Sequence, residues 1–218
     1  MNFLRQTQIF NPEEYNCNVV ILGAGSTGSY VAFTLAKMGI KNIKVIDYDK
    51  IEDHNLPNQY YRISDIGKFK VDALQEIIKD FCGINIEIEN VKIEKDMIIE
   101  MIGLNTIIIN CVDNIETRKI IAEDLQDYSI KIIDTRFGGE GYSIHIVSLD
   151  DDKSYEKYIK GLENPILATS CGEKAVIYTI NSLASEVCNI VKKMLKGEKY
   201  PILLRRELKT YRFIGGGR

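Results

Sequence analysis

CNVVILGAGSTGSYVAFTLAKMGIKNIKVIDYDK, at residues 17–50, carries the clearest structural pattern of this chain. The apolar run at residues 19–22 predicts a buried strand. Gly23, Gly25 and Gly28 follow it with the spacing G-x-G-x-x-G. A turn of this kind brings backbone N–H groups and the N-terminus of a helix against phosphate groups, so the pattern predicts nucleotide binding.

The residues after the turn complete a strand–helix–strand unit. Apolar side chains recur at helical spacing over residues 30–38, and Gly39 is well placed to end that helix. A second strand at residues 43–46 closes on Asp47, 19 residues after Gly28. A carboxylate there can bind both ribose hydroxyls, in NAD and in ATP alike. The unit alone does not decide between NAD and ATP. It also leaves open that the glycine turn serves packing only and binds no nucleotide.

Strands and helices continue to alternate up to residue 149. The polar stretch at residues 47–70 shows no periodicity, and loops of that length are often functional. We expect helices at residues 71–81, 97–103 and 113–125, and strands at 85–93, 105–112, 129–134 and 141–149. Asp113 and Glu116 form a capping-box pattern for the third helix. The alternation predicts an α/β, Rossmann-like fold with a doubly wound, mostly parallel sheet, which binds ligands at the carboxyl ends of its strands.

The pattern changes after residue 149. We expect a charged helix or lid at residues 150–165, a long amphipathic helix at 169–197 and a closing pair of antiparallel strands at 201–214. The apolar face of the long helix consists of Val176, Ile180, Leu183, Val187, Ile190, Val191 and Met194. The 218 residues are expected to form a single domain, with a nucleotide-binding core at 1–149 and a substrate-side elaboration at 150–218.

The composition is that of an ordinary globular protein, with 45% apolar and 27% charged residues. The net charge of −3 and the scattered Lys and Arg residues do not indicate a nucleic-acid partner. No apolar run reaches the roughly 18 residues of a membrane span, and the N-terminal residues lack the apolar core of a signal peptide. We therefore expect a cytoplasmic protein without a membrane partner.

The five cysteines are Cys17, Cys82, Cys111, Cys171 and Cys188. They are widely spaced without a C-x-x-C pair, so we expect neither a zinc knuckle nor a disulfide framework. Ser170 and Glu173 form a capping-box pattern that would make Cys171 the first residue of the long helix. A thiol at that position is stabilised as thiolate, although a small buried residue at a helix start is the alternative.

Three later stretches are more specific. DYDKIEDHNLPNQ, DIGKFKVDAL and NCVDN follow the glycine turn in that order. They resemble the D-x-D, N-x-x-R-Q, G-x-x-K and C-x-D-N motifs of the ubiquitin-activating-enzyme-like adenylyltransferases, often called ThiF-type proteins, which include the sulfur-carrier activators of molybdopterin and thiamine synthesis. LRQTQIF near the N-terminus resembles the R-Q segment of that family. The resemblance covers most of the chain and implies an adenylation domain.

The resemblance implies an enzyme that uses Mg-ATP to activate the C-terminal carboxylate of a small carrier protein or peptide. The products are an acyl-adenylate and pyrophosphate. Asp113 would hold Mg²⁺, Lys70 would contact phosphate oxygens, and Arg5 would enter the partner's site in a homodimer. Asp113 as a helix cap only, and Lys70 and Arg5 as solvated side chains, are the alternatives. The implied nucleotide-binding residues are Gly23, Gly25, Ser26, Thr27, Gly28, Asp47, Asp49, Asn55, Asn58, Gln59, Lys70 and Asn114.

The sequence departs from the family pattern at Asn58, where the motif N-x-x-R-Q has an arginine. Because Asn cannot neutralise phosphate charge, three explanations are open: the protein is slow, it is degenerate, or another arginine takes that place. Arg62 and Arg136 are the candidates, and we favour Arg136 because it follows a strand that should end near the site. The family's structural zinc ligands are also absent, so no structural zinc is expected. The position of Cys171 resembles the place where sulfur-carrier activators hold a reactive cysteine, which implies that it accepts the acyl group as a thioester or related adduct.

Two other functions remain open from the sequence. An NAD-dependent oxidoreductase explains the three glycines and Asp47, but it leaves the later motifs as coincidence. A non-catalytic module that binds nucleotide or a carrier is favoured by Asn58.

Overall fold

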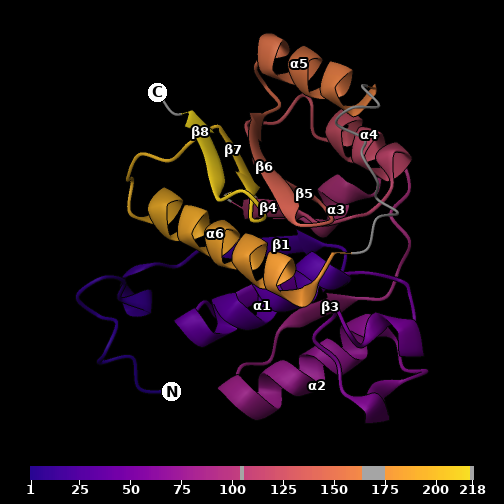
Figure 1. The fold of residues 1–218 in the computed structure, drawn as a ribbon, viewed down its shortest axis with the longest axis vertical. Helices are drawn as coiled ribbons and strands as arrows, with labels where there is room; N and C mark the ends of the chain where they lie inside the picture. Colours follow the sequence, from indigo (N-terminus) through magenta and orange to yellow (C-terminus); the bar gives the residue numbers. More distant parts are fainter. Residues whose placement is uncertain (104–105, 164–174, 217–218) are drawn as a thin grey trace.

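The computed structural model describes residues 1–103, 106–163 and 175–216, and its centre is an eight-stranded sheet (Figure 1). The strands are β1 (Asn18–Leu22), β2 (Asn42–Ile46), β3 (Glu87–Glu89), β4 (Thr106–Asn110), β5 (Lys131–Gly138), β6 (Gly141–Ser148), β7 (Leu203–Glu207) and β8 (Arg212–Gly216). Their order in the sheet is β3-β2-β1-β4-β5-β6-β7-β8.

The first five strands of this order are parallel, and the remaining three continue the sheet in antiparallel fashion. The predicted doubly wound, mostly parallel fold and its closing antiparallel strands are therefore confirmed. Leu22 at the end of β1 lies opposite Ile46 of β2 and Asn110 of β4. The loops after these three strands therefore begin at the same edge of the sheet.

Helices cover both faces of the sheet (Figure 1). They are α1 (Ser26–Met38), α2 (Lys70–Cys82), α3 (Ile98–Met101), α4 (Ile115–Asp124), α5 (Asp152–Glu163) and α6 (Ile177–Leu195). Single 3-10 turns lie at Pro12–Glu14, Asp53–Asn55 and Ile63–Asp65. No described helix is long and apolar enough to cross a membrane.

Strand β1 shows why the sheet has two covered faces. Val19 and Ile21 point into a core that they share with α1, α2 and α6, whereas Val20 and Leu22 point into a second core with α3, α4 and α5. Alternate residues of a strand face opposite sides, so a fully apolar run is buried on both. Gly39 ends α1 in the left-handed conformation with φ 98°, as predicted.

Two helices begin later than predicted. The N-cap of α4 is Asn114, whose side-chain oxygen accepts a hydrogen bond from N of Thr117 at 2.7 Å, so the predicted capping role of Asp113 is wrong. Helix α6 begins at Ile177 with Val176 at its N-cap, and Val176 is 50% exposed rather than part of the apolar face. Ser170, Cys171 and Glu173 lie outside the described residues.

Candidate active site

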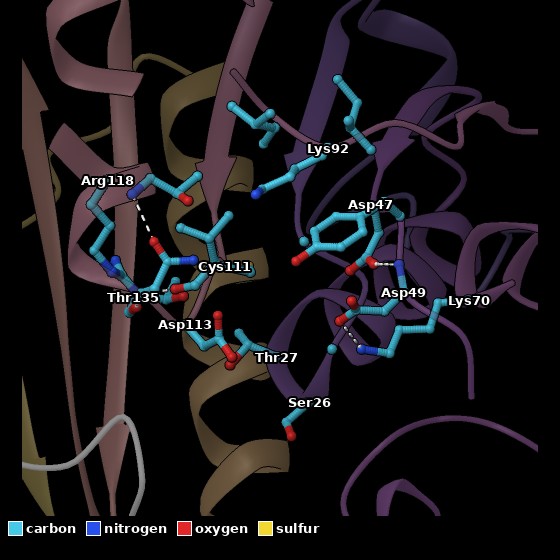
Figure 2. Close-up of a pocket in the computed structure, with 18 of the residues that line it drawn as sticks. Ser26, Thr27, Asp47, Asp49, Lys70, Lys92, Cys111, Asp113, Arg118 and Thr135 are labelled. Carbon is cyan, nitrogen blue, oxygen red and sulfur yellow. Dashed lines mark hydrogen bonds and ion pairs between the residues drawn. The ribbon is translucent and has the colours of Figure 1, made fainter. Parts of the chain in front are cut away.

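A cavity of about 440 Å³ opens at the carboxyl ends of β1, β2 and β4 (Figure 2). It is lined by the glycine turn, the loops after β2, β3 and β4, the first residue of α2 and part of β5. The predicted site residues found in its wall are Gly23, Gly25, Ser26, Thr27, Asp47, Asp49, Gln59, Lys70, Asp113, Asn114 and Arg136. The fold thus brings distant motifs together at the edge where ligands of such sheets bind.

Different physical reasons explain why each of the three positions in the turn is a glycine. Gly23 has φ +95°, and a Cβ there would lie 3.0 Å from the carbonyl oxygen of Cys111. A Cβ on Gly28 would lie 1.8 Å from the carbonyl oxygen of Gly23. At Gly25 a Cβ would meet nothing within 4 Å. Packing therefore accounts for Gly23 and Gly28, whereas Gly25 leaves its part of the cavity wall bare.

The N-terminus of α1 opens into the cavity. Gly25 at its N-cap has no side chain to bond the first N–H groups, and the first turn carries no acidic residue. These N–H groups and the helix dipole favour an anion. The hydroxyl of Thr27 and the side-chain oxygen of Gln59 are buried without a hydrogen-bond partner among the described residues. Buried polar atoms are normally paired, so these two are candidates for ligand contacts.

Asp47 joins the glycine turn to the loop after β2. Its Oδ2 accepts a hydrogen bond from N of Ala24 at 2.6 Å, and its Oδ1 accepts one from N of Asp49 at 2.8 Å. Burial raises the pKa of Asp47, and nearby Lys70 and these N–H groups oppose that effect. Each carboxylate oxygen can accept a further hydrogen bond, so Asp47 remains able to bind hydroxyl groups.

Lys70, the first residue of α2, is fixed against Asp49. Its Nζ lies 2.7 Å from Oδ2 of Asp49, and its backbone N donates to the carbonyl oxygen of the same residue at 2.9 Å. Lys70 is only 7% exposed. The predicted phosphate-binding lysine is therefore in the cavity wall, where its charge is balanced by one carboxylate.

Asp113 is exposed in the loop between β4 and α4. Figure 2 shows it across the cavity from Asp47. Within the described ranges, no three His, Cys, Asp or Glu side chains group as ligands for a metal ion. Mg²⁺ is commonly held by one or two carboxylates together with phosphate oxygens and water, so one carboxylate beside a phosphate site suits that ion.

A buried charge cluster forms the wall opposite the glycine turn. Asp134 of β5 is 0% exposed and pairs with Arg118 of α4, which is 4% exposed. Nη1 of Arg118 makes this ion pair, and its Nη2 donates to the carbonyl oxygens of Val112 and Thr135. This arginine therefore ties the loop that carries Asp113 to the sheet.

Arg136 belongs to the same cluster. Its Nε lies 2.8 Å from Oδ2 of Asp134, and its guanidinium lies 5.6 Å from the ring centre of Tyr158 in α5. The other candidate, Arg62, pairs with Asp80 at 2.9 Å and does not line the cavity. Of the two arginines considered for the place of Asn58, Arg136 is the one that the structure puts at the cavity.

Several predicted residues lie elsewhere. Asn55 and Asn58 are not in the cavity wall, and Oδ1 of Asn55 accepts from N of Glu52 at 2.9 Å to close a 3-10 turn. Gly28 is buried in α1 behind the turn. Cys171 lies outside the described residues.

Arg5 lies at the opposite end of α1 from the cavity. It is exposed, and the adjacent Gln6 donates from Nε2 to the carbonyl oxygen of Met38, the last residue of α1, at 2.7 Å. The cavity is at the first residues of the same helix.

Sequence reasoning missed six polar wall residues and the carboxylate behind them. The wall residues are Tyr48, Lys92, Cys111, Thr117, Arg118 and Thr135, and the carboxylate is Asp134. Asp134 carried a signal, because it ends an apolar strand run as Asp47 does. Burial raises the pKa of the Cys111 thiol to about 12, which favours the thiol over the nucleophilic thiolate.

Comparisons with known proteins agree with this geometry. The sequence model of the ThiF family matches residues 13–214. The adenylyltransferase and sulfurtransferase MOCS3 of Caenorhabditis briggsae is 28% identical over 189 residues, which are 82% of this chain and 46% of that protein. The NEDD8-activating enzyme E1 catalytic subunit of Arabidopsis thaliana is 37% identical over 105 residues, which are 47% of this chain and 23% of that protein. The chain spans less than half the length of these relatives.

Solved structures share the fold. PaaA superposes with a TM-score of 0.74 and 23% identity, over 93% of this chain and 65% of that one. MccB of E. coli in complex with ATP superposes with a TM-score of 0.73 and 18% identity, over 93% of this chain and 64% of that one. Because the family model matches residues 13–214, nearly the whole sequence, this chain belongs to the ThiF family.

Proposed function

We propose that this protein binds Mg-ATP in the cavity and transfers the adenylyl group to the C-terminal carboxylate of a small carrier protein or peptide. The observation that carries the proposal is the meeting of Asp47, Lys70 and Asp113 in one cavity. They come from three separate motifs, and each is suited to a different part of a nucleoside triphosphate. Relatives named as an adenylyltransferase and as an activating enzyme, and a structural neighbour solved with ATP, support it.

The cavity fits the nucleotide. Its volume of about 440 Å³ lies within the usual range of ligand pockets. Asp47 would accept the ribose hydroxyls, and the bare Gly25 with the first N–H groups of α1 would receive phosphates. The unpartnered Thr27 hydroxyl and Gln59 side-chain oxygen give the ligand two further polar contacts.

The reaction needs positioning and charge neutralisation more than a base. An oxygen of the substrate carboxylate attacks the α-phosphorus, a new P–O bond forms, and the bond to pyrophosphate breaks. Lys70 and Arg136 would hold phosphate or carboxylate oxygens in line through charge-assisted hydrogen bonds. Asp113 would hold Mg²⁺, which neutralises charge on the phosphates when it is bound. Arg118 would keep the Asp113 loop in place.

A homodimer is part of the proposal because Arg5 cannot serve its own cavity. Helix α1 has 13 residues and is therefore about 20 Å long at 1.5 Å per residue, and Arg5 lies beyond its far end. An arginine that acts at the phosphates from this position must act in a second subunit.

Mixing Arg5→Ala and Asp113→Ala subunits tests this arrangement. Each variant alone is expected to lose the tight, Mg-dependent binding of ATP, and the mixed dimer regains one intact site. An equal mixture should then show about one site per four chains by calorimetry, as expected for a symmetric dimer. A mixture that binds no more Mg-ATP than either variant would contradict action across subunits.

The alternative is a non-catalytic nucleotide-binding module, and Asn58 favours it. ATP–pyrophosphate exchange separates the two functions, because a module that binds without chemistry returns no label from pyrophosphate to ATP. NAD in place of ATP as the preferred ligand would instead support the oxidoreductase hypothesis.

The deciding experiment is a thermal stability series with Mg-ATP, ATP plus chelator, and NAD. A ligand at about 100 times its dissociation constant stabilises a protein by roughly 2.7 kcal/mol. The wild type should shift with Mg-ATP more than with ATP plus chelator, and Asp113→Asn should remove that difference. Glu116→Gln is the matched control, because Glu116 is an exposed acid in the first turn of α4 outside the cavity wall. A shift with NAD and not with ATP would overturn the proposal.

A further inference from the structure

Lys92 projects into the cavity from the loop after β3. It lines the wall, and Figure 2 shows its ammonium group between Asp47 on one side and Arg118 on the other. It lies three positions beyond Glu89, the last residue of β3. No motif of the sequence assigns a role to this lysine.

The backbone around Lys92 is fixed although its side chain is exposed. Ile93 is 7% exposed and belongs to the core between the sheet and α3 to α5, against which Val91 also packs. The carbonyl oxygen of Glu89 accepts a hydrogen bond from N of Asp47 at 3.2 Å. Val91 and Ile93 also line the cavity, and their apolar packing fixes the backbone from which the side chain of Lys92 projects.

Lys92 differs from the other cations of the cavity in having no anionic partner among the residues that the structure describes. Lys70 pairs with Asp49, and Arg136 pairs with Asp134. Arg118 also pairs with that carboxylate. Among the described residues, no carboxylate oxygen lies within 4.0 Å of the ammonium of Lys92.

The charge balance of the cavity shows why this difference between Lys92 and the other cations matters for ligand binding. The wall holds four cations (Lys70, Lys92, Arg118 and Arg136) and three carboxylates (Asp47, Asp49 and Asp113), and Asp134 behind it makes a fourth carboxylate. The described site is therefore close to neutral before any ligand binds. A polyphosphate entering it needs a positive group that is not already committed.

We propose that Lys92 binds the phosphate groups of the nucleotide and supplies the positive charge that is missing at Asn58. The inference rests on the proposed function, since it assumes a phosphorylated ligand in this cavity. The four-carbon side chain of a lysine carries a compact charge that can follow the ligand as it enters. Because Lys92 is exposed and makes no ion pair with the described part of the chain, replacing it should not disturb the fold.

Calorimetric titration of ATP into four proteins tests the proposal. Lys92→Gln should raise the dissociation constant about tenfold, which corresponds to about 1.4 kcal/mol. Lys92→Arg keeps the charge and should stay within about threefold of the wild type, since charge and not shape is required at this exposed position. Lys95→Gln is the matched control, because Lys95 is an exposed lysine three positions along the same segment and does not line the cavity.

The outcomes separate this inference from the proposed function. If the wild type and Lys95→Gln bind ATP and Lys92→Gln binds it equally well, Lys92 has no such role and the proposed function stands. If Lys92→Arg loses as much affinity as Lys92→Gln, the contribution is not one of charge and the inference is wrong. If the wild type itself binds no ATP, both proposals are overturned. Unfolding midpoints without ligand should agree among the four proteins.

Discussion

Oδ2 of Asp134 lies 2.8 Å from Nε of Arg136 and holds that guanidinium at the cavity wall. The two residues are separated by one position in β5, so their side chains leave the sheet on the same face. Only Nε of Arg136 is engaged by the carboxylate, and its Nη groups make no hydrogen bond with the described residues. This contact orients the arginine and leaves its two terminal nitrogens available to a ligand.

Arg136→Gln is expected to weaken ATP binding without unfolding the protein. Loss of a charge-assisted hydrogen bond costs about 1.5–3 kcal/mol, so the dissociation constant should rise roughly 10- to 100-fold. Stability should change little, because Asp134 keeps its pair with Arg118. Calorimetry and urea denaturation measure the two effects, and normal affinity and turnover of ATP in the variant would refute the role.

Asp134→Asn, in contrast to Arg136→Gln, should lower the stability of the protein. It leaves Arg118 and Arg136 without their shared countercharge, and breaking a buried ion pair from one side costs about 3–5 kcal/mol. Its free energy of unfolding should therefore fall by about that amount in urea denaturation. An unchanged stability would mean that the cluster is more hydrated than its burial indicates.

The contrast between Asp47 and Asp134 shows what the sequence could reveal about the site. Asp47 was predicted because its role is local, as it closes the strand that follows a glycine turn and binds N of Ala24. The role of Asp134 depends on Arg118, which lies 16 positions earlier in α4. That pairing follows from the packing of α4 against β5, which no spacing rule in one sequence expresses.

Lys92 was missed for a related reason. The alternating pattern predicted one strand over residues 85–93, whereas β3 ends at Glu89. Beyond that point the chain leaves the edge of the sheet, and Val91 and Ile93 pack into the core instead of continuing a ladder. If residues 85–93 formed one strand, Lys92 would share a face with Ile86 and Ile88, so the alternation alone does not place it in the cavity wall.

Gly25→Ala separates ligand contact from packing in the glycine turn. A Cβ there meets no protein atom within 4 Å, so the free energy of unfolding should stay within about 1 kcal/mol of the wild type. ATP affinity should fall at least tenfold, because the methyl group occupies the bare wall next to the first N–H groups of α1. Thermal unfolding and calorimetry measure the two quantities.

Gly161→Ala is the control for that substitution. It also meets nothing within 4 Å, lies in α5 away from the cavity wall, and should be neutral or stabilising with unchanged ATP affinity. Gly28→Ala, with its Cβ 1.8 Å from a backbone oxygen, should instead unfold the turn. If Gly25→Ala and the wild type bind ATP equally well, Gly25 does not contact the ligand.

His145 predicts a pH dependence of stability. Burial and the nearby Arg136 lower its pKa from 6.5 to about 4 in the folded protein. Between these values the unfolded chain binds a proton that the folded chain does not, so the free energy of unfolding falls as pH falls from about 6.5 to about 4. The loss is at most about 3 kcal/mol for a shift of this size.

Urea denaturation at several pH values between 7 and 4.5 measures this dependence. His145→Gln should flatten it, because the titrating group is gone. His54→Gln is the matched control, because the His54 side chain is 69% exposed. An equal slope in wild type and His145→Gln would place the origin of the pH dependence in other groups.

The cysteines allow a test of Cys171 as the acyl acceptor that the family resemblance implies. Burial is the main cause that raises the thiol pKa of Cys17, Cys82, Cys111 and Cys188, and for Cys111 the pKa reaches about 12. These thiols should react slowly with iodoacetamide at neutral pH, because the thiolate is the reactive form. A cysteine that accepts an acyl group has a lowered pKa, so Cys171 should be alkylated at least about tenfold faster than the other four.

Mass spectrometry of the folded protein after brief alkylation identifies the modified residue. Cys171→Ser should remove the fast label, whereas Cys111→Ser should not affect it. In concentrated urea all five cysteines should react alike, because burial no longer distinguishes them. Fast labelling at Cys17, which is only half-buried, with Cys171 unmodified would contradict a thioester role and would leave the acyl-adenylate as the product that the protein releases.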